Sequence, residues 1–271
     1  MLGKLFKHEF KETAKLLVPL NLALVALTII GAILLGTSVL QNESFEILAV
    51  SSMLIYMLSI FALFIITTVY LAIRYYKTMY SSEGYLTHTL PVSSTAIINT
   101  KVVIAAFWSF VALCITICSV FVLIRVTAGS DWNITAQEIS SIIPEIFGFG
   151  FGEFISYLIA SCILSCLSSV LTIFASLAIG QLFQQHRVIA AVVTYIIFYI
   201  IQQIIGSVTM GLMAINNADA LMETEVTSAN ATMMTSFYRG TFCYGIIESV
   251  LFVIVFYIIC YYITKKKLNL E

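Results

Sequence analysis

Charged residues are scarce in this sequence. Aspartate, glutamate, lysine and arginine together make up 10% of its 271 residues, whereas hydrophobic residues make up 61%. Soluble proteins contain about 25% charged residues. The composition therefore excludes a soluble domain and indicates an integral membrane protein, for which nucleic acid is not an expected partner.

Several catalytic signatures are absent as well. The sequence has no G-x-x-x-x-G-K-[ST] phosphate-binding loop, no H-E-x-x-H motif and no pair of carboxylates within an apolar run. Its three histidines, His8, His88 and His186, all lie outside the apolar runs. No catalytic residue is therefore expected, and ATP with its magnesium ion would have to be bound by another chain.

The six cysteines indicate neither a metal site nor a disulfide framework. Cys114 and Cys118, like Cys162 and Cys166, are spaced by four residues and share a helix face, which leaves open a path for a soft metal. No histidine or methionine motif joins the two pairs. The preferred interpretation is that these thiols are small buried hydrophobic groups, so no metal or cofactor is expected in this chain.

Six apolar runs are long enough to cross a membrane, because a helix of about 20 residues spans about 30 Å of hydrocarbon. They lack the alternating polar residues that a transmembrane barrel requires. The sequence therefore predicts an all-α integral membrane protein with a single transmembrane domain over residues 1–271. The expected spans are about 16–40, 47–73, 102–124, 154–180, 188–214 and 242–264.

The distribution of positive charge predicts that both termini lie in the cytoplasm. Cytoplasmic connections of membrane proteins carry an excess of lysine and arginine. With six spans, 11 of the 13 basic residues fall on the side that holds both termini, and the other side has Arg125 and Arg239. The expected location is the cell membrane.

The segment before the first run, residues 1–15, is predicted to form an amphipathic helix in the cytoplasmic interface. Leu2, Leu5, Phe6 and Phe10 lie near one face, and lysines occupy much of the remainder. One interpretation is an anchor whose lysines reach anionic headgroups of the membrane lipid. The other is an elbow helix that also contacts a cytoplasmic partner.

The connection over residues 74–101 is the longest polar stretch on the predicted cytoplasmic side. Gly84 can end the preceding helix, and Pro91 interrupts any helix that reaches it. Ser93 or Ser94 can then cap a new helix. A short element held between two helices in this way is suited to transmit force from a docked partner, although it could also simply turn the chain into the third span.

Residues 80–101 resemble the ABC-2 permease family, the membrane subunits of one class of ATP-binding-cassette exporters. The resemblance comprises the pair Glu83-Gly84, the turn Leu90-Pro91-Val92-Ser93, and Lys101, ten residues after the proline. The plan of an N-terminal amphipathic helix, six spans and cytoplasmic termini also resembles this family. The resemblance implies that the segment docks on an ATPase subunit through Glu83, Gly84, Tyr85, Leu86, Leu90, Pro91 and Val92.

The resemblance also implies a function. The chain would be a permease in a bacterial plasma membrane, paired with a second copy or a similar permease chain and powered by a separate ABC-type ATPase subunit. The scarcity of charge favours an amphipathic or lipid-like substrate, or an antimicrobial peptide, over a sugar or an ion. Export is the expected direction by analogy with the family.

Two further places are candidates for a substrate pathway. Glu248 lies well within a predicted span, where it could bind a cation or couple protons. It could instead reach water or pair with Arg239 or Arg125. Phe149 and Phe151 alternate with glycines just before the fourth span, where they could form part of an exit gate or a simple turn at the interface.

Two other functions compete with transport driven by ATP. A channel or secondary carrier centred on Glu248 would work without ATP, although the sequence shows no repeated halves of the kind that carriers often have. A membrane scaffold or sensor would recruit a signalling partner through residues 74–101 without moving a substrate. The identity of the cytoplasmic partner distinguishes the scaffold from the permease.

Overall fold

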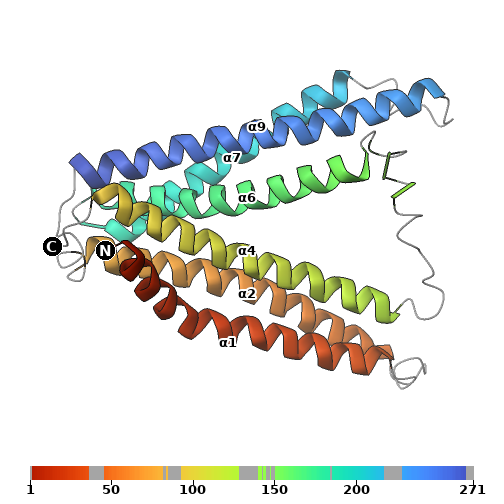
Figure 1. The fold of residues 1–271 in the computed structure, drawn as a ribbon, viewed down its shortest axis with the longest axis horizontal. Coiled ribbons are helices and arrows are strands. Elements are labelled where there is room, and N and C mark those ends of the chain that lie inside the picture. Colours follow the sequence, from red (N-terminus) through yellow and green to blue (C-terminus); the bar gives the residue numbers. More distant parts are fainter. Residues whose placement is uncertain are drawn as a thin grey trace. The chain divides into compact units, whose positions relative to one another are not determined.

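The computed structural model describes residues 2–36, 46–81, 93–127, 150–183, 185–216 and 228–266, together with residues 84, 140–141, 143–144 and 147. Six long helices account for nearly all of them (Figure 1). All six are long and apolar enough to cross a membrane, so the prediction of an all-α multi-pass membrane protein with six spans is confirmed. The helices are α1 (Leu2–Gly36), α2 (Glu46–Tyr80), α4 (Ser94–Thr127), α6 (Phe151–Gly180), α7 (Arg187–Asn216) and α9 (Ser228–Lys266).

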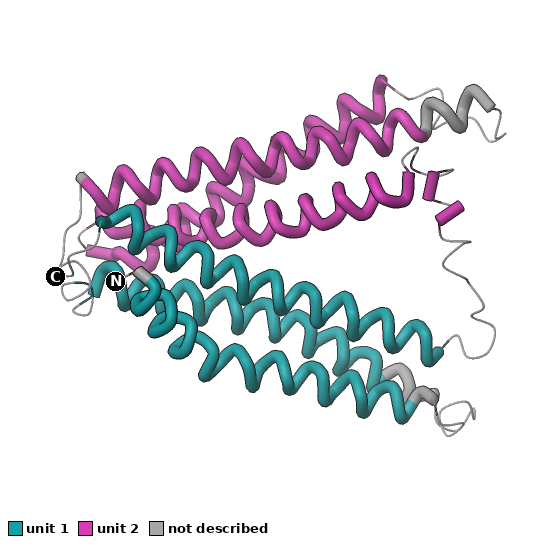
Figure 2. The backbone as a smooth tube through the Cα atoms, viewed as in Figure 1, with its two compact units in different colours: residues 1–133, 270–271 teal, residues 134–269 magenta. Residues whose placement is uncertain are grey.

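The six helices belong to two compact units (Figure 2). Unit 1 lies within residues 1–133 and contains α1, α2 and α4, whereas unit 2 lies within residues 134–269 and contains α6, α7 and α9. Within each unit, every helix packs against the other two. Each unit therefore has an interior of its own.

Apolar side chains from all three helices form the core of unit 1. Leu24 of α1, Leu63 of α2 and Ala112 of α4 are buried together. Tyr56 of α2 also shares a hydrogen bond with Ser119 of α4, with 2.7 Å between the two hydroxyl oxygens. Because lipid offers no hydrogen bonds, pairing these hydroxyls across two helices removes the cost of leaving either one unsatisfied.

Helix α1 continues through the predicted boundary at residue 15. The helix is unbroken over its 35 residues, and at 1.5 Å per residue it is about 52 Å long. Pro19 lies inside it, where the proline ring removes the hydrogen bond to the Lys15 carbonyl and bends the helix without ending it. Figure 1 shows the first part of α1, in dark red, at an angle to the rest. The predicted amphipathic segment is therefore not a helix separate from the first span, and its place in the membrane interface stays a prediction.

Small residues let α6 and α7 approach closely in unit 2. A Cβ atom added to Gly180, the last residue of α6, would lie 2.6 Å from the Cβ and 2.8 Å from the backbone nitrogen of Ala191 in α7. Farther along the same pair of helices, the Gln202 amide donates a hydrogen bond to Thr172 Oγ1 at 3.0 Å. Close contact between small residues and interhelical hydrogen bonds are the usual means of helix association in lipid.

The outer surface of the helices is largely apolar. Helix α7 shows this most clearly, because Ala191 is its buried residue and most of its valines and isoleucines are exposed. A helix that is hydrophobic on all sides is unstable as a surface helix in water but is suited to lipid. The exposure of these side chains therefore agrees with the assignment of a membrane protein.

Candidate functional site

A cluster of three charged side chains joins the helices of unit 1. Glu9 of α1 is only 9% exposed. Its Oε2 accepts hydrogen bonds from Arg74 of α2, at 3.1 Å from Nε and 3.0 Å from Nη2. Its Oε1 accepts a hydrogen bond from Lys101 Nζ of α4 at 2.9 Å. One carboxylate thus connects all three helices, and we call Glu9, Arg74 and Lys101 the charge clamp.

Hydroxyl groups complete the hydrogen bonding around the charge clamp. Lys101 Nζ donates to Thr78 Oγ1 at 2.5 Å, and Thr78 in turn donates to the Arg74 carbonyl at 2.8 Å. Thr13 Oγ1 accepts a hydrogen bond from Trp108 Nε1 at 2.9 Å. A buried network of charges is stable only when its members are hydrogen-bonded. These hydroxyls provide hydrogen bonds of this kind around the buried charges of unit 1.

Helix periodicity explains how these residues come together. Glu9 and Thr13 are four residues apart on α1 and therefore share a face, as Arg74 and Thr78 do on α2. Phe10, next to Glu9, stacks on Trp108 with 5.4 Å between the ring centroids. The first part of α1 therefore packs on protein through Glu9, Phe10 and Thr13. The apolar face that the sequence predicted, with Leu2 and Leu5, did not include Glu9 and Thr13, the two polar residues of this contact.

The charge clamp is a network of ion pairs between three helices. Two cations oppose one anion in a largely buried place, where the ion pairs must offset a large cost of desolvation. Two N–H groups of the Arg74 guanidinium donate to the same carboxylate oxygen of Glu9, and both bonds are charge-assisted. The arrangement can hold three helix ends in a fixed relation, and this is the property that a force-transmitting element requires.

The residues that the sequence assigns to ATPase docking fall mostly beyond the part of the chain that the structure describes. Gly84 is described: it is buried, and its backbone N–H donates a hydrogen bond to the Ser81 carbonyl at 2.7 Å. The docking assignment itself stays a prediction. The members that lie outside the described residues are Glu83, Tyr85, Leu86, Leu90, Pro91 and Val92.

The helices on either side of this segment extend close to it. Helix α2 continues to Tyr80, and α4 begins at Ser94. The Ser93 carbonyl accepts hydrogen bonds from the N–H groups of Ala96 and Ile97, at 2.9 and 3.2 Å. A new helix was predicted to follow a cap at Ser93 or Ser94, and α4 does begin at Ser94. Both helices extend past the ends of the spans expected from apolar length alone.

Glu248 of α9 lies against α7 in unit 2. A Cβ atom added to Gly206 of α7 would be 3.7 Å from Glu248 Oε1, which is an ordinary van der Waals distance. No described residue of unit 2 forms a hydrogen bond or an ion pair with it, Arg239 included. Glu248 lies within the candidate span Thr235–Lys265, as predicted.

Of the two predicted gate residues, Phe149 lies outside the described residues. Phe151 is the first residue of α6, and 43% of its surface is exposed.

Phe147 was not singled out from the sequence, although it belongs to the same run of alternating phenylalanines. Phenylalanines spaced by two residues, such as Phe147, Phe149 and Phe151, cannot all lie on one face of a helix. This spacing was the sequence signal that Phe147 could have a different environment from the two predicted gate residues. Phe147 packs in an aromatic cluster with Phe154, Tyr238 and Phe242, at centroid distances of 4.9, 5.2 and 6.1 Å.

The cysteines contribute no cluster of ligands. Within the described ranges, no group of three or more histidine, cysteine, aspartate or glutamate side chains could hold a metal ion. All six cysteines are free thiols, and Cys166 and Cys260 are buried. That the chain binds neither metal nor cofactor stays a prediction.

Comparison of the chain with protein-family models, with curated proteins and with solved structures finds no match. The resemblance of residues 80–101 to ABC-2 permeases therefore stays a prediction. What is established is a multi-pass membrane protein with six candidate spans.

Proposed function

We propose that this chain is the permease subunit of an ATP-binding-cassette exporter, driven by a separate ATPase that docks on residues 74–101. The observation that supports the proposal most is the charge clamp. Arg74 and Lys101 are the two ends of the predicted docking segment, and both bind the carboxylate of Glu9. The segment therefore begins and ends at one buried anchor on α1.

Force transmission follows from this anchor. A displacement of the docked segment would act on the end of α2 and the start of α4 together, because Glu9 ties both to α1 through charge-assisted hydrogen bonds of 2.9 to 3.1 Å. The packed helices of unit 1 would then move as one body. Rigid-body motion of helix bundles driven by a partner is an established means of switching.

The substrate class follows from the apolar character of the helices. Described ionisable residues are few along the spans, so a pathway between two such permeases would offer mainly apolar surface. An amphipathic or lipid-like molecule, or an antimicrobial peptide, suits that surface better than a sugar or an ion. The proposed location is a bacterial plasma membrane, and the proposed assembly contains two permease chains and the ATPase.

Substitution of Leu90 by arginine tests the docking segment. The tagged protein, purified from its native membrane, should bring a P-loop ATPase with it, and Leu90→Arg or Pro91→Arg should lower the recovered ATPase by about tenfold, because a charge would be forced into an apolar contact. Leu182→Arg is the matched control, since Leu182 is exposed in the short connection between α6 and α7. Wild-type protein that never brings an ATPase would refute the permease.

A carrier centred on Glu248 is the second candidate, favoured by the position of this carboxylate within a candidate span of α9, on the side that faces Gly206 of α7. In vesicles that contain the purified chain alone, a carrier would accumulate a lipophilic fluorescent cation without ATP, and Glu248→Gln would abolish the accumulation. Glu153→Gln, an exposed carboxylate at the start of α6, is the control. For the proposed permease we expect no ATP-independent accumulation in any of the three proteins.

The scaffold or sensor is distinguished by the nature of its partner. It too would bring a cytoplasmic protein through residues 74–101, and Leu90→Arg would release that protein. A released partner without ATPase activity would favour the scaffold, whereas an ATPase favours the permease.

A further inference from the structure

A ridge of polar and small residues runs along the exposed surface of α7 in unit 2. Its members follow one another at intervals of four residues, so they lie on successive turns of the helix. Each of them is exposed. We call them the α7 ridge, and its residues are Tyr195, Tyr199, Gln203, Ser207 and Gly211.

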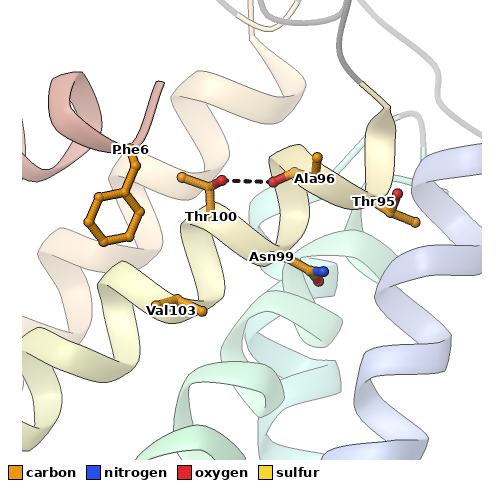
Figure 3. Close-up of a pocket in the computed structure, with 6 residues that line it drawn as sticks. All are labelled: Phe6, Thr95, Ala96, Asn99, Thr100 and Val103. Carbon is orange, nitrogen blue, oxygen red and sulfur yellow. Dashed lines mark hydrogen bonds between the residues drawn. The ribbon is translucent and has the colours of Figure 1, made fainter. Parts of the chain in front are cut away.

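The polar side chains of the α7 ridge form no hydrogen bond with any described residue. Hydroxyl groups on spanning helices can instead bond to a carbonyl of their own helix. Figure 3 shows this for Thr100 of α4, which donates to the Ala96 carbonyl at 2.8 Å beside a groove of unit 1. In α7 itself, Thr194 and Thr209 donate to carbonyls four residues earlier, at 2.8 Å each. The hydroxyl and amide groups of the α7 ridge differ from these, because they stay available for a partner.

Gln203 is the member of the α7 ridge for which a partner matters most. It lies near the middle of α7, about 24 Å from Arg187 and about 20 Å from Asn216 at 1.5 Å per residue. The side chain is too short to reach water at either end of the span, and lipid offers no hydrogen bonds to its amide. The adjacent Gln202 faces the interior of unit 2 and donates to Thr172 Oγ1 at 3.0 Å. The partner of Gln203 must therefore come from outside the described residues of unit 2.

We propose that the α7 ridge is the surface through which two copies of this chain associate in the membrane. A carboxamide carries both a donor and an acceptor, so two Gln203 side chains related by a two-fold axis can form two hydrogen bonds with each other. No described residue of unit 1 exposes a carboxamide near the middle of a span, since Asn21 is buried and Asn99 lies near the start of α4. A second copy, in contrast, presents the same group at the same depth.

The shape of the α7 ridge suits close contact between two helices. Ser207 and Gly211 are small and four residues apart, which is the pattern that lets transmembrane helices approach each other. A Cβ atom added to Gly211 would meet nothing within 4 Å, so the backbone there is accessible to a partner. Ridges with a spacing of four residues interdigitate when two helices cross at about −50°. Tyr199, one turn before Gln203, adds a hydroxyl to the same contact.

Two copies joined in this way would be the two permease chains of the proposed function, on which this identification of the second chain rests. Self-association can be measured without ATP, substrate or the ATPase. A chain that stays monomeric would refute the contact through α7, whereas a P-loop ATPase recovered with the same protein would still support the permease. The two proposals can therefore fail separately.

Self-association is measured on the full chain in lipid vesicles. Protein with a donor fluorophore and protein with an acceptor fluorophore, each on a C-terminal tag, are reconstituted together at increasing dilution in lipid, and energy transfer reports the dimer. Gln203→Leu should weaken the association about tenfold, because two interhelical hydrogen bonds are lost. Gln202→Leu is the matched control and should leave the association unchanged, because its amide bonds within unit 2.

Disulfide cross-linking tests which chain lies on the α7 ridge. A two-fold axis at the ridge brings Ser207 close to its counterpart, so Ser207→Cys should yield a disulfide-linked dimer above the background of the wild type with its six cysteines. Ile205→Cys should not, because Ile205 is exposed two residues earlier, on the opposite side of the helix. A monomeric wild type, equal losses for Gln203→Leu and Gln202→Leu, or a cross-linked product of another mass would each overturn the proposal.

Discussion

Replacing Glu9 with glutamine should lower the free energy of unfolding by about 3–5 kcal/mol. Arg74 and Lys101 both bind this carboxylate, and Lys101 is only 8% exposed. Glutamine keeps the size of the side chain but removes the charge that the two cations share, so two like charges would face each other in a largely buried place. A thermal scan of the purified chain should show a Tm lower by about 6–20 °C.

Two further variants make this expectation specific. Glu12→Gln, in the same helix, should leave the Tm unchanged, because Glu12 pairs with the exposed Lys15 at 2.7 Å in contact with water. Lys101→Met should cost less than Glu9→Gln, because it leaves the pair of Glu9 with Arg74 intact. If Lys101→Met were the more damaging change, Glu9 would not be the shared partner that holds the charge clamp together.

Adding one methyl group at Gly180 should destabilise unit 2 by about 2–3 kcal/mol. The new Cβ would lie 2.6 Å from the Ala191 Cβ and 2.8 Å from the Ala191 Cα and nitrogen. Two of these neighbours are backbone atoms, so α6 and α7 would have to separate. Thermal unfolding of Gly180→Ala, followed by fluorescence-detected size exclusion, should reveal the loss.

A glycine-to-alanine substitution at a position with free space should not lower the stability of the protein. Gly211 lies inside α7 with nothing within 4 Å of an added Cβ, so Gly211→Ala should leave stability unchanged or raise it by about 0.5–1 kcal/mol through the better helix propensity of alanine. Adding Ala191→Gly to Gly180→Ala should restore only part of the loss, since the Ala191 backbone stays too close. Full stability of Gly180→Ala would show that the two helices are not held at this distance.

The spanning helices could be predicted because the length and apolarity of a run of residues are almost sufficient evidence for a helix that crosses lipid. A start of α4 close to Ser93 or Ser94 was also predictable, since proline and serine act on the local backbone. The continuity of α1 was not predicted, because a change from charged to apolar residues was interpreted as a boundary. The backbone does not respond to that change, and Pro19 bends the helix four residues later.

The charge clamp could not be predicted from the sequence. Glu9 stands among four lysines in an amphipathic segment, where an acid is usually a solvated residue. Its partners lie 65 and 92 residues away, and no local pattern indicates which of the basic residues would reach it. Lys101 was counted as a cytoplasmic charge for orientation and as part of the family resemblance, yet in the fold its ammonium group is buried. Tertiary contact alone identifies this site.

The long separation between the members of the charge clamp has a consequence for the synthesis of the protein. At about 5–20 residues per second, a ribosome needs roughly 5–18 s to pass from Glu9 to Lys101. During this interval Arg74 becomes available first, and Lys101 can bind only after α4 has begun to emerge. The nascent chain therefore cannot complete unit 1 before its third helix is made, and an insertion machinery or chaperone has that interval in which to shield the acid at position 9.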